Sequence, residues 1–258
     1  MSGEVVHLEI AGPVATITLD SPANRNALSR QLTTELEQRL RAARDDARVR
    51  VIILTGAGSV FCSGADLKEQ RTANAAGERS GPGALVPILE ILLDSPKPIV
   101  GRINGAARAG GLGLVAACDI AVAVDSATFA VSEVRVGVIP AIISVVLLPK
   151  IGRTRASELF LTAEPITAST AVAAGLLTSS AAPKRLDETV DGYVASLLKG
   201  APGALQGAKE LIRQVPLMER NHAFAAMVER SADYFASAEA LEGMAAFAEK
   251  RQPRWQAD

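Results

Sequence analysis

Two glycine-rich segments of the sequence could do chemistry through their backbone. One is Phe61-Cys62-Ser63-Gly64-Ala65-Asp66-Leu67, and the other is Ala109-Gly110-Gly111-Leu112-Gly113, which opens a predicted helix. A pair of N–H groups on two such loops can hold an oxyanion, helped by the positive N-terminal end of the helix. The alternative is that both segments are tight turns, in which glycine provides positive φ and close packing. The residues alone leave both interpretations open.

Glu133 is the candidate acid/base, because it lies in a segment, residues 129–140, where nearly every neighbour is apolar. A carboxylate in apolar surroundings is costly unless it is paired. One interpretation is therefore an ion pair with the nearby Arg135 or with the more distant Arg153 or Arg155. The other is a general acid/base whose pKa is raised toward neutrality by burial.

Other catalytic arrangements have little support. His7 and His222 are the only histidines and lie in regions of different pattern, so neither a histidine triad nor a two-histidine metal site is expected. Phe61 stands where the G-x-S-x-G motif around Ser63 would need glycine, which argues against a serine hydrolase. The two cysteines form no C-x-x-C pair. We expect neither a disulfide framework nor a metal site.

A dinucleotide site also has to be considered, because residues 111–116 fit the pattern G-x-G-x-x-A. In that motif a strand leads directly into the first glycine. Here the predicted strand ends near Ile103, and residues 104–109 intervene before Gly110. We therefore do not expect a nicotinamide dinucleotide to bind.

Length and composition limit the classes of protein further. The chain has 258 residues, of which 48% are hydrophobic and 21% charged, so it can bury a sizeable core. Its 27 basic and 28 acidic residues give a formal net charge of −1, which argues against a general nucleic-acid or membrane binder. Neither a secretory signal nor a membrane-spanning segment is recognisable. The expected location is the cytoplasm.

The elements that would position the candidate residues alternate between strand and helix up to about residue 180. We expect strands at 5–10, 14–19, 49–55, 99–103, 120–124 and 128–131, and helices after Ser29 and at 85–93. Residues 68–83 are polar and predict a mobile loop or short helix over a site. Residues 186–248 predict about three helices, with Pro202 and Pro216 near their starts.

Five segments, in this order and at these separations, together resemble the crotonase (enoyl-CoA hydratase/isomerase) superfamily. They are residues 61–67, Ile103-Asn104-Gly105 leading to Ala109-Gly110-Gly111, Ala117-Cys118-Asp119, Glu133 before Gly137 and Ile139-Pro140, and residues 242–251. The resemblance implies an α/β fold, with a crotonase-type spiral of ββα units over residues 1–195. It also implies a C-terminal helical oligomerisation region, residues 196–258, that forms trimers or a hexamer built as a dimer of trimers.

The same resemblance implies a coenzyme A thioester as substrate and no metal or redox cofactor. The oxyanion-hole N–H groups would belong to Ala65 and Gly110, and the acid/base would be Glu133. The CoA-binding residues implied by position are Arg25 and Ala27 on the adenine side, Ala65, Asp66, Leu67 and Lys68 along pantetheine and adenine, and Lys250, which would reach the 3′-phosphate of a neighbouring subunit's CoA.

The sequence departs from the common hydratase pattern at Gly113. Hydratases of the common type hold one water between two glutamates, and the first of these positions is Gly113 here. A single glutamate at the position of Glu133 is what Δ3,Δ2-enoyl-CoA isomerases use, so isomerase chemistry is an alternative. A non-catalytic CoA-binding homologue is another, although such a protein has no evident need to bury an acid.

Residues 111–119, 132–137 and 139–144 look most like the bacterial methylglutaconyl-CoA hydratase branch, whose members also tend to carry glycine at the first position. Hydratase chemistry is therefore the favoured prediction. Because Gly113 has no Cβ, we expect it to leave room for a branched acyl chain.

Overall fold

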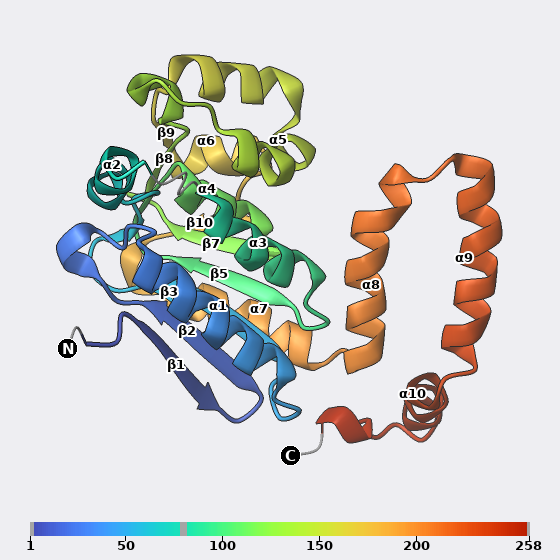
Figure 1. Ribbon diagram of the computed structural model, residues 1–258. Coiled ribbons are helices and arrows are strands. Elements are labelled where there is room, and N and C mark those ends of the chain that lie inside the picture. Colours follow the sequence, from blue (N-terminus) through green and yellow to red (C-terminus); the bar gives the residue numbers. More distant parts are fainter. Residues whose placement is uncertain (1–2, 78–81, 257–258) are drawn as a thin grey trace.

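The computed structural model describes residues 3–77 and 82–256 and contains two β-sheets followed by a helical extension (Figure 1). The larger sheet has the order β1-β2-β3-β5-β7-β10. Its strands are β1 (Val6–Ala11), β2 (Val14–Leu19), β3 (Val51–Gly56), β5 (Ile99–Ile103), β7 (Ile120–Val124) and β10 (Ser179–Ala181). β1 and β2 form an antiparallel hairpin and the remaining neighbours are parallel. The strands expected at 5–10, 14–19, 49–55, 99–103 and 120–124 are thus confirmed.

The apolar pattern of each strand accounts for its place in this sheet. In β2 every second residue, from Ala15 to Leu19, is fully buried, which is the period of a strand with one face on the core. All six residues of β3 are buried. A continuous apolar run is what a central parallel strand covered on both faces requires.

Helices cover both faces of the larger sheet. α1 (Arg30–Asp45) and α3 (Leu85–Asp94) pack on one face, and α7 (Leu186–Leu198) packs on the other (Figure 1). As expected, Ser29 caps α1: its side chain accepts a hydrogen bond of 3.2 Å from the backbone N–H of Leu32. α4 (Gly110–Ala117) lies next to α3, and α5 (Ala141–Thr162), which is kinked at Gly152, packs on α4. α6 (Ala168–Ala173) follows.

A second, smaller sheet has the order β4-β6-β8-β9. It consists of β4 (Val60–Cys62), β6 (Ala106–Arg108) and β8 (Thr128–Ala130), which run parallel, and β9 (Ile166–Thr167), which is antiparallel to β8. Only the strand at 128–131 was expected. The others were missed because two or three residues cannot show a hydrophobic period, and β6 is rich in alanine.

The polar segment at 68–83 is in part a helix, α2 (Leu67–Ala75), and residues 78–81 of that prediction lie outside the described residues. Asp66 caps α2 by accepting from the backbone N–H groups of Lys68 (3.0 Å) and Glu69 (3.2 Å). Asp119, at the entry to β7, accepts from the N–H of Ile99 (2.7 Å). Both are the local caps that their positions at the ends of apolar runs predict.

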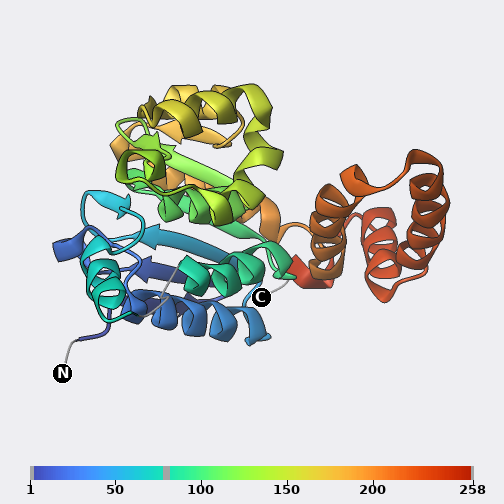
Figure 2. The ribbon, with the colours of Figure 1, turned by 45° about the horizontal axis from the view of Figure 1, so that its top comes forward.

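The C-terminal helices project away from the two sheets as an arm (Figures 1 and 2). The arm comprises α8 (Pro202–Gln214), α9 (Arg220–Phe235) and α10 (Ala238–Ala248). Pro202 opens α8, and Pro216 lies in the 3₁₀ turn before α9. Lys209 of α8 ties the arm to the core through an ion pair of 2.8 Å with Asp119. No helix in the described residues is long and apolar enough to cross a membrane.

Candidate active site

Three parallel strands of the small sheet end beside one another and place the candidate residues. Ala65 follows β4, Gly110 follows β6, and Glu133 follows β8, each within three residues of the last residue of its strand. The ladder pairs Cys62 with Ala107, and Ala107 with Phe129. Parallel neighbours finish at the same edge of a sheet. The structure therefore brings Ala65, Gly110 and Glu133 to one edge.

The two glycine-rich loops touch each other at Gly64. This residue has φ +86°, and a Cβ there would lie 2.8 Å from Ala109 Cβ and 2.9 Å from the carbonyl oxygen of Arg108. Only glycine fits so close an approach. Each loop is also fixed by a backbone hydrogen bond, since Leu28 N–H donates to Gly64 O (2.8 Å) and Ala109 N–H donates to Ala130 O (3.0 Å).

The backbone N–H groups of Ala65 and Gly110 remain available. Within the described part of the chain, neither donates a hydrogen bond to another residue. Gly110 is the first residue of α4, where N–H groups have no partner inside the helix and carry the positive end of its dipole. Two free donors on adjoining loops are the arrangement that can stabilise charge on a carbonyl oxygen.

Glu133 begins the 3₁₀ turn Glu133–Val136 directly after β8. Its Oε2 atom is buried and has no hydrogen-bond partner in the described structure. Burial raises the pKa of this carboxyl above its ordinary value of 4.5. A half-buried carboxyl with one buried, unused oxygen can take up and release a proton at pH values where exposed carboxylates stay ionised.

The ion-pair interpretation of Glu133 finds no support in the geometry. Arg135 pairs with Glu164 and Arg155 pairs with Glu158. No ion pair within 4.0 Å of Glu133 occurs among the residues that the structure describes. The alternative raised by the sequence, a carboxyl kept for proton transfer, is the one that fits this environment.

The space expected beside Gly113 is not open. Gly113 is buried in α4, and a Cβ at this position would lie 2.7 Å from Ile143 Cγ2 and 3.7 Å from Leu89 Cδ2. The prediction that Gly113 leaves room for a branched acyl chain is thus wrong in this form. The missing side chain is compensated by Ile143 from α5, which the sequence pattern did not single out.

The residues assigned to CoA lie on both sides of the loop before α2. Arg25 is exposed with φ 59°, and its carbonyl accepts from the N–H of Ser63 (3.1 Å). Ala27 is 5% exposed, so it offers little side-chain surface. Leu67 and Lys68 are exposed in the first turn of α2.

Lys250 is not brought to this place within one chain. It follows α10, which folds back to the start of α8, where Gly203 N–H donates to Glu239 (3.0 Å), and which Figure 1 shows well away from the small sheet. A role for Lys250 at a CoA site would therefore need a second subunit, as the sequence analysis assumed.

Asn26 is a positioning residue that the sequence analysis did not name. It is fully buried with φ 53°, and its Nδ2 lies within hydrogen-bond distance of the carbonyl oxygens of Ala57 (3.0 Å), Val60 (2.8 Å) and Phe61 (3.2 Å). Asn26 thereby fastens the loop that carries Arg25 to the start of β4. The residue type itself could have indicated this role, because asparagine adopts the left-handed backbone conformation more readily than most residues.

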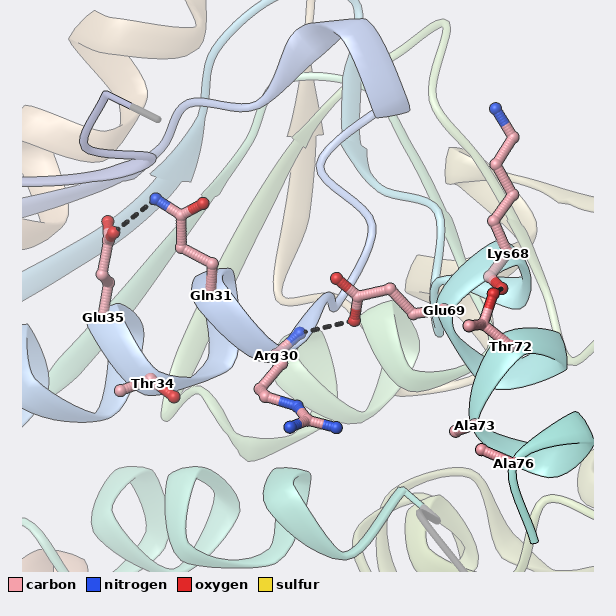
Figure 3. A pocket seen from close by; sticks show the side chains of 9 residues that line it. All are labelled: Arg30, Gln31, Thr34, Glu35, Lys68, Glu69, Thr72, Ala73 and Ala76. Carbon is pink, nitrogen blue, oxygen red and sulfur yellow. Dashed lines mark hydrogen bonds between the residues drawn. The ribbon is translucent and has the colours of Figure 1, made fainter. Parts of the chain in front are cut away.

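A hollow of about 830 Å³ lies between α1 and α2 (Figure 3). Lys68 and Glu69 of α2 line one side, and the Glu69 carboxylate accepts from the N–H of Arg30 (2.8 Å) on the other. Neither Ala65, Gly110 nor Glu133 lines it. The hollow thus adjoins the first turn of α2 but is separate from the edge where the three candidate groups meet.

Comparison with known proteins decides the family. A sequence profile described as enoyl-CoA hydratase/isomerase matches residues 9–258. The chain belongs to the enoyl-CoA hydratase/isomerase family. A relative named carnitinyl-CoA dehydratase, from Salmonella arizonae, is 33% identical over 98% of each chain.

Solved structures support both the assignment to this crotonase family and the fold. Pseudomonas aeruginosa AtuE matches with a TM-score of 0.93 and 33% identity, over 98% of this chain and all of the other. An enoyl-CoA hydratase from Mycobacterium smegmatis matches with a TM-score of 0.88 and 31% identity, over 98% and 99%. The predicted crotonase fold is therefore confirmed. The protein is an enzyme of the enoyl-CoA hydratase/isomerase family, in which a relative is named as a dehydratase of a CoA thioester.

Proposed function

We propose that this enzyme adds water to a 2-enoyl-CoA thioester, or removes it from the product, with Glu133 as the acid/base at the reacting carbons. The observation that carries the proposal is the buried, unpartnered Oε2 of Glu133 at the strand edge that also holds the free N–H groups of Ala65 and Gly110. An acid/base and an oxyanion hole are together what an enolate mechanism requires.

In the hydration direction, the thioester oxygen accepts hydrogen bonds from Ala65 and Gly110. The Glu133 carboxylate takes a proton from water while the water oxygen bonds to C3, and the negative charge moves through C2 to the thioester oxygen. The two N–H groups and the end of the α4 dipole stabilise this enolate more than the neutral substrate. The proton held by Glu133 then passes to C2, and the carboxylate is restored.

Isomerisation is the second candidate, and the geometry beside Gly113 is what favours it. Ile143 occupies the place of a second water-holding carboxylate. In that reaction Glu133 removes a proton from C2 of a 3-enoyl thioester and returns it to C4, through the same enolate. A non-catalytic CoA-binding role is less favoured, because an unpaired buried carboxyl costs stability and would serve no purpose.

For the substrate, we propose a branched 2-enoyl group of the methylglutaconyl type, on the resemblance of residues 111–119 and 132–144 to that branch. Arg25, Ala27 and residues 65–68 would contact the CoA moiety. Residues 196–258 would join subunits into a trimer or hexamer, in which Lys250 reaches the CoA of a neighbour. The arm's exposed Phe224, Phe235 and Phe247 support such a role. The proposed location is the cytoplasm.

The test is a panel of 2-enoyl- and 3-enoyl-CoA thioesters, incubated with the wild type and with Glu133→Gln and analysed by mass spectrometry. We expect a gain of about 18 Da, the mass of water, on 2-enoyl substrates, and a loss of turnover of roughly 10² to 10⁴-fold in Glu133→Gln with CoA-ester binding retained. An unchanged mass with a shifted double bond would mean isomerisation instead. Wild-type turnover in Glu133→Gln would refute the assigned role.

A further inference from the structure

The face of α4 that carries the oxyanion donor also carries Gly113. Gly110 and Gly113 are three residues apart, and such residues are neighbours on one face of a helix, about 5–6 Å between their side-chain positions. A Cβ on Gly110 would meet Leu28 Cδ1 at 2.7 Å and Leu85 Cδ2 at 3.3 Å. This face of α4 is therefore bare backbone against a wall of apolar side chains.

Beside Gly113 this wall is made by Ile143 and Leu89. Ile143 is 3% exposed and Leu89 4% exposed, so both are held in place by surrounding residues. Ile143 Cγ2 comes within 2.7 Å of where a Cβ on Gly113 would be, closer than real side chains tolerate. The pair is therefore complementary, with the branched side chain on α5 filling the space that the glycine leaves on α4.

Ile143 is also connected to the acid/base segment. α5 begins eight residues after Glu133, and the intervening turn is closed by a hydrogen bond of 3.2 Å from Val138 N–H to the carbonyl oxygen of Glu133. Ile143 thus packs on the helix that presents the oxyanion donor, and it follows the carboxyl-bearing Glu133 by ten residues in the chain. An acyl group that extends from the reacting carbons toward Gly113 would therefore meet Ile143.

We propose that Ile143 is a specificity-determining residue, whose Cγ2 methyl limits the size of the acyl group on the Gly113 side of the reacting carbons. This inference rests on the proposed CoA-thioester function of the same site. The wall is apolar, so it accepts hydrocarbon there, and a polar group on the acyl chain has to point elsewhere to keep its hydrogen bonds. Gly113 and Ile143 act as one unit in setting this limit.

The test compares Ile143→Val, Ile143→Ala, Gly113→Ala and the double variant Gly113→Ala/Ile143→Ala. Val146→Ala is the matched control, because Val146 is also buried in α5 but is not among the nearest neighbours of a Cβ position on the glycines of α4. For each variant, kcat/KM is measured on 2-enoyl-CoA thioesters with and without a methyl at C3 and with longer chains. Thermal unfolding identifies any variant that fails to fold.

We expect Ile143→Ala to shift the kcat/KM ratio toward the bulkier thioesters by about 10-fold or more, the discrimination that one or two methylene groups supply, and Ile143→Val to shift it less. Val146→Ala should leave the ratio unchanged. Gly113→Ala should lower activity on every thioester, and the double variant should recover much of that loss. An equal ratio in Ile143→Ala and Val146→Ala, or additive effects in the double variant, would overturn the proposal.

A binding readout separates this inference from the proposed reaction. The dissociation constants of butanoyl-CoA, 3-methylbutanoyl-CoA and octanoyl-CoA can be measured by calorimetry without turnover. If the wild type turns over no enoyl-CoA, the proposed function fails, and the affinity ratios of Ile143→Ala and Val146→Ala still decide the role of Ile143. Affinity ratios that respond to neither substitution refute that role independently.

Discussion

Ala109 provides the sharpest test of how the oxyanion hole is built. It has φ 47° and ψ −122°, a backbone conformation that residues other than glycine rarely adopt. Such a conformation costs of order 1–3 kcal/mol and persists only where the surroundings impose it. Here the N–H of Ala109 is held by Ala130 O at 3.0 Å, and its methyl group lies against Gly64 on the other loop. The strain falls on the residue directly before the donor Gly110.

Replacing this residue, Ala109→Gly, should therefore raise stability and lower activity. Relief of strain contributes about 1–3 kcal/mol. Two effects lower the free energy of unfolding. Glycine has greater freedom in the unfolded chain, which costs about 0.4–1 kcal/mol. The contact of one methyl group is lost, which costs at most about 0.8 kcal/mol. The net effect therefore runs from a loss of about 0.8 to a gain of about 2.6 kcal/mol and is centred on a gain of about 1 kcal/mol. Each kcal/mol gained raises Tm by roughly 2–4 °C in a chain of this size.

The expected loss of activity follows from the freedom gained by the loop. Removing an oxyanion donor altogether costs about 10² to 10³-fold in kcat. Ala109→Gly keeps the Gly110 N–H but loosens its direction, so a decrease of about 10-fold in kcat is expected, with a smaller effect on KM. The assay is steady-state kinetics on the best thioester of the panel, with calorimetric unfolding on the same samples.

Ala163→Gly is the matched control. Ala163 also has positive φ, 54°, but it ends α5 and belongs to neither glycine-rich loop. Its substitution should stabilise the protein without changing kcat. The argument fails if Ala109→Gly lowers Tm, or if it raises Tm and leaves kcat at the wild-type value.

Three further outcomes are expected. Burial raises the pKa of Glu133 in the folded protein, so ionisation of this carboxyl lowers the free energy of unfolding. The loss is absent at pH values below the pKa in the unfolded chain, near 4.5. It grows as the pH rises toward the higher pKa in the folded protein and is complete above that pKa. Glu133→Gln should therefore unfold at higher temperature than the wild type at pH 7 and at the same temperature at pH 4, which thermal scans can check. Asn26→Ala should cost about 2–3 kcal/mol in urea unfolding, because three carbonyl groups lose their donor, whereas the exposed Asn74→Ala should cost little. Light scattering at micromolar protein should give three or six times the chain mass of 26.8 kDa, and a monomer mass would contradict the proposed role of the arm.

Five of the six strands of the larger sheet could be predicted because they are long enough to show a pattern, whereas the three-residue β10 was missed. β1, β2, β3, β5 and β7 each have five or six residues, and their apolar periods identify them without any structure. The small sheet could not be predicted in the same way. β4 and β6 have three residues each and are defined by pairing with partners far away in the chain. Their existence depends on tertiary contacts, which local patterns do not contain.

The residue types of the site could be predicted, but their packing could not. Glycine at 64 and 110 and a carboxylate at 133 are each unusual for their local sequence, so they attract attention. Ile143 is an ordinary apolar residue at the start of a helix, and nothing local distinguishes it from Ile142. Its importance appears only when α5 is seen against Gly113, and it reverses the expectation of an open space there.

The features that weaken this fold gather at the edge of the small sheet. Glu133 has a buried oxygen without a partner, Ala109 holds a strained backbone, and the Ala65 and Gly110 amides donate to no other described residue. Each feature lowers stability, and each is also what the proposed proton transfer and enolate binding need. The fully buried strand β3 contacts β4, and the Asn26 hydrogen bonds fasten the start of β4, so both help to fix the strand that leads into Ala65. Substitutions that relieve one of these costs should therefore stabilise the protein at the expense of its rate.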